Sequence, residues 1–173
     1  ATRPNIGGAS ADFLTAPEAS QMFGELIGLW CAHEWDALGK PAFNWIELGP
    51  GRGVLMQDAM RATQRIEGLH DAANIVLVEV SEPLKEEQAE RVPVAEWAPR
   101  IEDTPPGPSL VIANEFFDCL PIRQFIRGED GWHEKLVGLD DANKLTFGLC
   151  APIPGPESDD EPVEQPRPRP VPR

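Results

Sequence analysis

The stretch Trp45-Ile46-Glu47-Leu48-Gly49-Pro50-Gly51-Arg52-Gly53 decides the fold. An apolar segment over 43–48 leads into three glycines, and a helix is predicted to begin at about Val54. Glycine tolerates positive φ and lets the backbone approach a ligand without an intervening Cβ atom. The free N–H groups at the start of the following helix would point toward that ligand. The stretch therefore predicts a strand, turn and helix that bind a nucleotide-like cofactor.

The segments around this stretch alternate between helix and strand patterns. We expect helices over about 15–38, 54–66 and 84–91, strands over 43–48, 74–80 and 109–114, a short strand near 94–97, an extended segment over 122–127 and a hairpin of 132–139 and 144–149. The apolar strands are typical of a parallel sheet buried on both faces. The order predicts an α/β sandwich with a mostly parallel sheet. We predict an approach segment over 1–14, the α/β domain over 15–150, and an extended or disordered Pro-rich tail over 151–173.

The first predicted helix has signals at its start and along one face. Thr15 and Glu18 have the spacing of a capping box, and Pro17 stands in the first turn. Gly24 and Gly28 are four residues apart, which favours close packing against another backbone over a role in ligand binding. Five apolar residues share helical spacing and are expected to face the core: Phe23, Leu26, Ile27, Trp30 and Leu38.

Composition excludes several classes of function. The chain has 15 basic and 29 acidic residues and a net charge of −14, which disfavours nucleic acid and anionic membranes as partners. No apolar run approaches the ~20 residues that span a bilayer. Three widely spaced cysteines indicate a reducing compartment, and the three histidines lack metal-ligand spacing. Because the chain starts without Met or a signal peptide, we expect it to begin inside a longer protein.

Two cofactor classes fit a glycine turn followed by an acidic strand end. Dinucleotide-binding folds use Gly-x-Gly-x-x-Gly, whereas this chain has the tighter Gly-x-Gly-x-Gly. Glu47, just before the turn, would repel a pyrophosphate but suits the ammonium and sulfonium of S-adenosylmethionine. Glu79, at the end of the next strand, would accept hydrogen bonds from the ribose hydroxyls. The pattern favours a methyltransferase over a nicotinamide-dependent oxidoreductase, for which the chain also offers no plausible His or Tyr proton donor.

Four motifs occur in a family-specific order: residues 15–25 (TAPEASQMFGE), 47–53 (ELGPGRG), 78–81 (VEVS) and 114–121 (NEFFDCLP). Over about residues 11–149 the chain resembles the family of the mitochondrial complex I assembly-factor arginine methyltransferase and its bacterial homologues. The resemblance implies a Rossmann-like class I methyltransferase that uses S-adenosylmethionine. For mitochondrial members it also implies symmetric dimethylation of an arginine in a complex I subunit. The expected location is the mitochondrial matrix in a eukaryote and the cytoplasm in a bacterium.

The chain departs from the family pattern in three ways. Ala11 stands where members usually have glycine, and Cys119 where they have alanine. Family members also continue well beyond the point where this chain stops, so we expect an incomplete sheet. An alternative function is therefore a non-catalytic assembly or interaction module that keeps the methyltransferase fold.

Roles can be assigned to individual residues as hypotheses. The predicted cofactor-binding residues are Glu47, Gly49, Gly51, Gly53 and Glu79, with Asp12 and Thr15 closing over the ligand. The predicted catalytic residues are Asn114, Glu115 and Asp118, where donor and acceptor should meet and a carboxylate could orient a protonated guanidinium. Structural alternatives stay open for several positions. Asp118 could cap a short helix, Arg52 could form a surface ion pair, and Phe116 and Phe117 could be core residues or a pocket wall.

Overall fold

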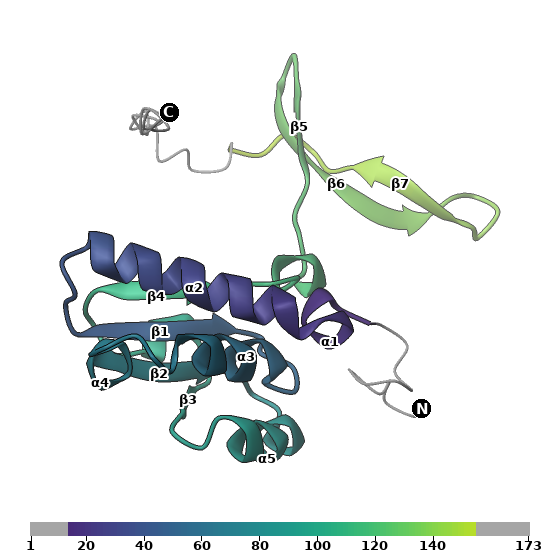
Figure 1. The fold of residues 1–173 in the computed structure, drawn as a ribbon. Helices are drawn as coiled ribbons and strands as arrows, with labels where there is room; N and C mark the ends of the chain where they lie inside the picture. The colour runs from purple at the N-terminus through teal and green to yellow at the C-terminus, as the bar shows by residue number, and fades with distance from the viewer. Residues whose placement is uncertain (1–13, 155–173) are drawn as a thin grey trace, which may run out of the picture. The chain divides into compact units, whose positions relative to one another are not determined.

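The computed structural model describes residues 14–154, which belong to two compact units, 1–120 and 121–173. The first unit contains α1 (Ala16–Ala19), α2 (Gln21–Ala37), β1 (Phe43–Leu48), α3 (Val54–Thr63), α4 (Leu69–Ala72), β2 (Ala73–Val78), α5 (Glu82–Arg91), β3 (Glu96–Ala98), η1 (Ile101–Asp103), β4 (Ser109–Ile112) and η2 (Phe117–Cys119) (Figure 1). The second contains β5 (Phe125–Gly128), β6 (Gly131–Leu139) and β7 (Leu145–Leu149). Asp12 and the tail from 155 onward lie outside the described residues, and the predicted domain limits remain a prediction.

The sheet of the first unit has four strands in the order β3-β2-β1-β4, and every neighbouring pair is parallel. This arrangement confirms the predicted α/β architecture. Leu48 at the end of β1 pairs with Val78 at the end of β2, and Glu47 pairs with Ile112 at the end of β4. The polar segments that follow these three strands therefore leave the sheet at the same edge.

Hydrophobic side chains pack on both faces of this sheet. One face contacts α2 and α3 and forms the main core, which includes Trp45, Leu77, Leu55 and Met56 (Figure 1). The opposite face carries a smaller cluster of Ile46, Leu48, Val76, Val78 and Ala98, against which Ala113 and Phe116 pack. Alternate residues of β1 thus enter different clusters, as expected for a strand covered on both sides.

The buried face of α2 differs from the predicted one. Small residues and Trp35 form the buried side, namely Gly24, Gly28, Cys31, Ala32 and Trp35. Phe23 and Ile27 pack against the core as predicted, whereas Leu26 is 59% exposed, Trp30 54% and Leu38 60%. A Cβ atom on Gly28 would lie 2.6 Å from the Cα and carbonyl oxygen of Ala59 in α3. The glycines therefore serve close packing, as predicted, and this close approach turns the larger side chains outward.

The start of the first helical segment also differs from the prediction. Ser20 is extended, with φ −157° and ψ 121°, so a short α1 and a separate α2 replace one continuous helix. Thr15 stands at the N-cap of α1, but no side-chain capping hydrogen bond forms, and the predicted capping box is wrong. Glu18 instead pairs with Arg52 of the glycine turn at 3.6 Å, which gives its carboxylate a cationic partner.

The second unit is a three-stranded antiparallel sheet in the order β5-β6-β7. The predicted hairpin is present, and Asp140 Oδ1 accepts hydrogen bonds from the backbone amides of Ala142 and Lys144 in its loop. Exposed apolar residues on the β6–β7 ribbon include Val137, Leu139, Leu145 and Phe147. Within residues 14–154, none of the helices combines the length and apolar character required to cross a membrane.

Candidate functional site

The glycine turn joins the end of β1 to the start of α3. Gly49, Gly51 and Gly53 all have positive φ, at 60°, 54° and 81°. The Gly49 amide donates to the Val78 carbonyl at 3.1 Å, and the Gly53 amide donates to the Pro50 carbonyl at 2.8 Å. The turn is therefore fixed against β2 and closes on itself before α3 begins.

The three glycines are needed for different physical reasons. A Cβ atom on Gly49 would lie 2.7 Å from Cδ2 of Phe116, and one on Gly53 would lie 3.3 Å from Cγ of Gln88. At Gly51, a Cβ atom would meet no described atom within 4 Å. Packing thus accounts for Gly49 and Gly53, while the open space beside Gly51 is where a ligand could approach the backbone. Phe116 therefore lies against Gly49 and also packs on the smaller hydrophobic cluster of the sheet.

Glu47 is a buried carboxyl group directly before the turn. Its exposed fraction is 3%, and Oε2 has no hydrogen-bond partner among the described residues. Burial raises the pKa of Glu47 to about 8, against the opposing effect of a hydrogen bond from the Met56 backbone amide. A buried carboxyl oxygen without a partner is costly. A ligand group that donates a hydrogen bond or carries positive charge would therefore be favoured beside Glu47.

Glu79 follows β2 and is held by the turn that leads into α5. Its Oε1 accepts hydrogen bonds from the backbone amides of Val80 and Ser81, both at 2.8 Å. Its Oε2 lies 3.4 Å from Nε2 of Gln88, at the long limit for such a contact. One oxygen is thus engaged in local structure, and the other keeps acceptor capacity for a ligand hydroxyl.

The segment after β4 brings Asn114, Glu115 and Asp118 to the same edge of the sheet. Asn114 is half-buried and, with Phe23, Ile27, Leu55, Ile112 and Ala113, lines a hollow of about 180 Å³. Glu115 is exposed and has φ 51°, a conformation that non-glycine residues seldom adopt outside strained or functional positions. Asp118 is exposed within η2, where no side-chain cap forms. The capping alternative for Asp118 therefore has no support in the described residues.

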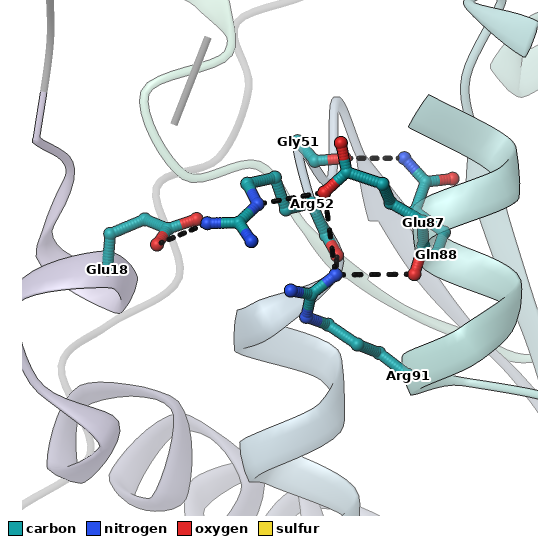
Figure 2. Close-up of polar contacts among 6 residues, drawn as sticks. All are labelled: Glu18, Gly51, Arg52, Glu87, Gln88 and Arg91. Carbon is teal, nitrogen blue, oxygen red and sulfur yellow. Dashed lines mark hydrogen bonds and ion pairs between the residues drawn. The ribbon is translucent and has the colours of Figure 1, made fainter. Parts of the chain in front are cut away.

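Side chains from α5 hold the glycine turn from one side (Figure 2). Gln88 Nε2 donates to the Gly51 carbonyl at 2.7 Å, and Arg91 Nη1 donates to the Arg52 carbonyl at 3.2 Å. Arg52 itself pairs with Glu87 at 2.9 Å and with Glu18 at 3.6 Å, which confirms its ion-pair interpretation. Sequence patterns gave no indication of Gln88 or Arg91, because both stand in a polar helix without a motif.

A second hollow of about 180 Å³ lies at the opposite edge of the sheet, beside Asn44, Asn74 and Gly107. Its two amides already have partners, since Asn74 donates to the Asn44 side chain at 3.1 Å and Asn44 donates to the Pro105 carbonyl at 2.8 Å. The glycine-turn edge is chemically the better candidate, because an unpaired buried carboxyl oxygen and a strained acidic residue both occur there.

Comparison with known proteins identifies a family whose members share this part of the chain. A family model described as "Putative S-adenosyl-L-methionine-dependent methyltransferase" matches residues 26–168. The chain belongs to this family. The match includes the glycine turn, Glu79 and the segment after β4, whereas Thr15 lies before its first residue.

Curated relatives of this family member carry the name protein arginine methyltransferase NDUFAF7, mitochondrial. The protein from Danio rerio is 43% identical over 169 residues, covering 81% of this chain and 40% of the relative. The Homo sapiens protein is 39% identical over 172 residues, covering 83% of this chain and 39% of the relative. The chain thus spans about two fifths of the length of these relatives.

Solved structures agree with the fold. A Burkholderia thailandensis protein bound to S-adenosyl-homocysteine aligns with a TM-score of 0.60 and 27% identity, covering 83% of this chain and 37% of that protein. A native structure from the same organism aligns with a TM-score of 0.57, also at 27% identity, and covers 87% of this chain and 40% of that one. The parallel sheet and its helices are therefore those of a Rossmann-like S-adenosylmethionine-dependent methyltransferase.

Proposed function

We propose that this chain carries the S-adenosylmethionine-binding part of a protein arginine N-methyltransferase. The observation that carries the proposal is the combination, at one edge of the sheet, of open space beside Gly51, an unpaired Oε2 on buried Glu47 and a partly free carboxylate on Glu79. A cationic methionine end near Glu47 and ribose hydroxyls near Glu79 would satisfy both groups. When bound, the cofactor supplies the electrophilic methyl group.

Residues of this chain would position the reaction. Gly51 would let the methionine part approach the backbone, while packing of Gly49 on Phe116 keeps the turn in shape. Half-buried Asn114 lines the hollow near which methyl donor and acceptor would meet. The exposed carboxylates of Glu115 and Asp118 would orient the guanidinium group of the substrate. An arginine side chain is protonated near neutral pH, so a nearby carboxylate would hold it electrostatically and assist loss of its proton. The catalytic contribution would come mainly from positioning.

The finer assignments rest on the resemblance and on the names of the relatives. The proposed substrate is a protein that presents an arginine, with a subunit of respiratory complex I as the proposed target in a mitochondrial setting. The proposed location is the mitochondrial matrix for a eukaryotic source and the cytoplasm for a bacterial one. Asp12 and Thr15 remain proposed contacts at the entrance to the cofactor site.

The cofactor proposal is tested by Gly51→Ala, with Gly39→Ala as its matched control. Both glycines have positive φ, and a Cβ atom at either would meet no described atom within 4 Å. Each substitution should cost about 1 kcal/mol of stability from backbone strain. Only Gly51→Ala should weaken binding of S-adenosyl-homocysteine, by about tenfold or more in calorimetry, because its methyl group enters ligand space. Equal affinity for the two variants would contradict the assignment.

Methyl transfer distinguishes an enzyme from a binding module. The full chain is incubated with S-adenosylmethionine carrying a labelled methyl group and with an arginine-containing complex I subunit, and labelled arginine is measured by mass spectrometry. Glu115→Gln should bind the cofactor normally but lose at least about 10²-fold in transfer rate, the usual range for a positioned acid–base group. Cofactor binding without transfer by the unmodified chain would instead favour the non-catalytic assembly module.

A further inference from the structure

We propose that Gln88 is a positioning residue that fixes the glycine turn and Glu79 relative to each other for recognition of the cofactor ribose. Among the residues of α5, Gln88 alone is buried, with an exposed fraction of 0%. Its side chain reaches both parts of the candidate site, the Gly51 carbonyl at 2.7 Å and Glu79 Oε2 at 3.4 Å. This inference rests on the proposed cofactor site and names a function for a residue that would not itself touch the ligand.

Trp97 determines the orientation of the Gln88 amide. The indole Nε1 of Trp97 donates to Oε1 of Gln88 at 2.8 Å. Because an indole N–H can only donate, Oε1 must face Trp97 and the NH₂ group must face Gly51 and Glu79. The flipped amide would place its NH₂ group against the indole N–H of Trp97 and its oxygen against the acceptor oxygens of Gly51 and Glu79. A half-buried residue of β3 therefore fixes which atoms Gln88 presents to the site.

Gln88 also limits where the turn can lie. A Cβ atom on Gly53 would be only 3.3 Å from Gln88 Cγ, so the stem of the side chain packs against the third glycine while its amide binds the carbonyl of the second. At Glu79, the backbone amides of Val80 and Ser81 hold Oε1, and the Gln88 NH₂ group approaches Oε2. The long 3.4 Å contact orients Oε2 and leaves it able to accept a stronger hydrogen bond from a ribose hydroxyl.

Arg91 provides an internal comparison on the same helix. Its Nη1 donates to the Arg52 carbonyl at 3.2 Å, a contact that, like those of Gln88, fastens α5 to the glycine turn (Figure 2). The same atom also donates to the Glu87 carbonyl within α5 at 3.3 Å. The described residues give Arg91 no hydrogen bond to Glu79. Loss of Arg91 should therefore loosen the turn, whereas loss of Gln88 should both loosen the turn and release the carboxylate that selects the ribose.

The test compares two ligands, S-adenosyl-homocysteine and its 2′,3′-dideoxy analogue, by calorimetry on the full chain. The ratio of their dissociation constants measures recognition of the ribose hydroxyls, whereas a general loss of structure lowers both affinities together. Gln88→Met, which keeps the volume but removes the amide, should reduce the ratio by roughly fivefold, the value of one hydrogen bond. Glu79→Gln should reduce the ratio by a similar factor. The double variant with Gln88→Met and Glu79→Gln should have the same ratio as Glu79→Gln alone. Arg91→Met should leave the ratio unchanged.

The outcomes separate this inference from the proposed function. If the unmodified chain does not bind S-adenosyl-homocysteine, the proposed function fails and the inference fails with it. If the unmodified chain prefers the hydroxylated ligand and Gln88→Met keeps that preference, only the inference is overturned. Should Gln88→Met not fold, Trp97→Phe replaces it, because loss of the indole donor frees the Gln88 amide to rotate. Trp97→Phe should then lower the ratio by about twofold or more, and an unchanged ratio would overturn the inference.

Discussion

The position of Glu47 was predicted from the sequence, but its protonation state differs from the one that the sequence implies. The motif indicated a carboxylate beside a cationic ligand, but burial raises its pKa to about 8. Without a ligand, the group therefore keeps its proton near neutral pH. An ammonium group nearby would favour the ionised form and lower this pKa. The sequence thus predicts where the Glu47 carboxyl group lies, whereas its protonation state depends on its burial between α3 and β1.

The raised pKa predicts how stability depends on pH. The unfolded chain loses the Glu47 proton near pH 4.5, while the folded protein keeps it up to about pH 8. The contribution of Glu47 to stability is therefore fully present below pH 4.5 and is lost as pH rises toward 8, by at most about 1.4 kcal/mol per pH unit. Glu47→Gln cannot ionise, so the free energy of unfolding of the unmodified chain should fall relative to this variant between pH 5.5 and 7.5 in urea titrations.

The control for this prediction is Glu86→Gln on the exposed side of α5. Because the Glu86 side chain is exposed, replacing it should change the free energy of unfolding little. This variant should therefore follow the unmodified chain at pH 5.5 and at pH 7.5. Parallel pH profiles for the unmodified chain and Glu47→Gln would show that Glu47 is not held in its neutral form.

Other residues show where sequence reasoning stops. Gly49, Gly51 and Gly53 were predicted together as a ligand cradle, yet only Gly51 adjoins open space. Gln88 was not predicted at all, because its partners at Gly51 and Glu79 are 37 and 9 positions away and no local pattern connects them. The residue types in the motif were informative, but the division between packing and ligand contact required the tertiary structure.

At the level of elements, the strands were easier to predict than the faces of helices. The predicted apolar strands, including the short one near 94–97, occur close to their expected limits, because buried parallel strands leave a continuous apolar pattern. In α2 the pattern of large apolar residues was misleading. Gly24 and Gly28 bring α2 against α3, and Leu26 and Trp30 point to the exposed side. Close helix packing selects small residues, which a search for large apolar side chains overlooks.

The packing of α2 on α3 predicts the effect of Gly28→Ala. In an exposed helix this change would stabilise by about 1 kcal/mol through helix propensity. Here the new Cβ atom would lie 2.6 Å from Ala59 backbone atoms, so we expect a net loss of about 1–3 kcal/mol in chemical unfolding. Leu26→Ala, on the exposed side of the same helix, should change stability by less than about 0.5 kcal/mol. A stabilised Gly28→Ala variant would contradict the close approach.

At the level of the whole molecule, every described residue of the candidate site belongs to the first unit, from Thr15 to Asp118. Within that unit, the glycine turn depends on contacts that are distant along the chain. The Gly51 carbonyl is bound from 37 residues away and the Arg52 carbonyl from 39 residues away. The contacts between α2 and α3 enclose a part of the chain that contains β1, whereas those between the turn and α5 enclose α3, α4 and β2.

The hydrogen bonds from Gln88 and Arg91 of α5 to the glycine turn have a consequence for the order of folding. The entropy cost of closing a loop grows with its length, and the contacts from α5 close a somewhat longer loop than those between α2 and α3. We therefore expect the turn to reach its final shape late, beyond the rate-limiting barrier. S-adenosyl-homocysteine would then bind the native state but not the transition state. At a ligand concentration of 100 times the dissociation constant, unfolding should slow by about 100-fold while refolding keeps its rate. Stopped-flow measurements with and without the ligand would show this asymmetry, and faster refolding would place formation of the turn before the barrier.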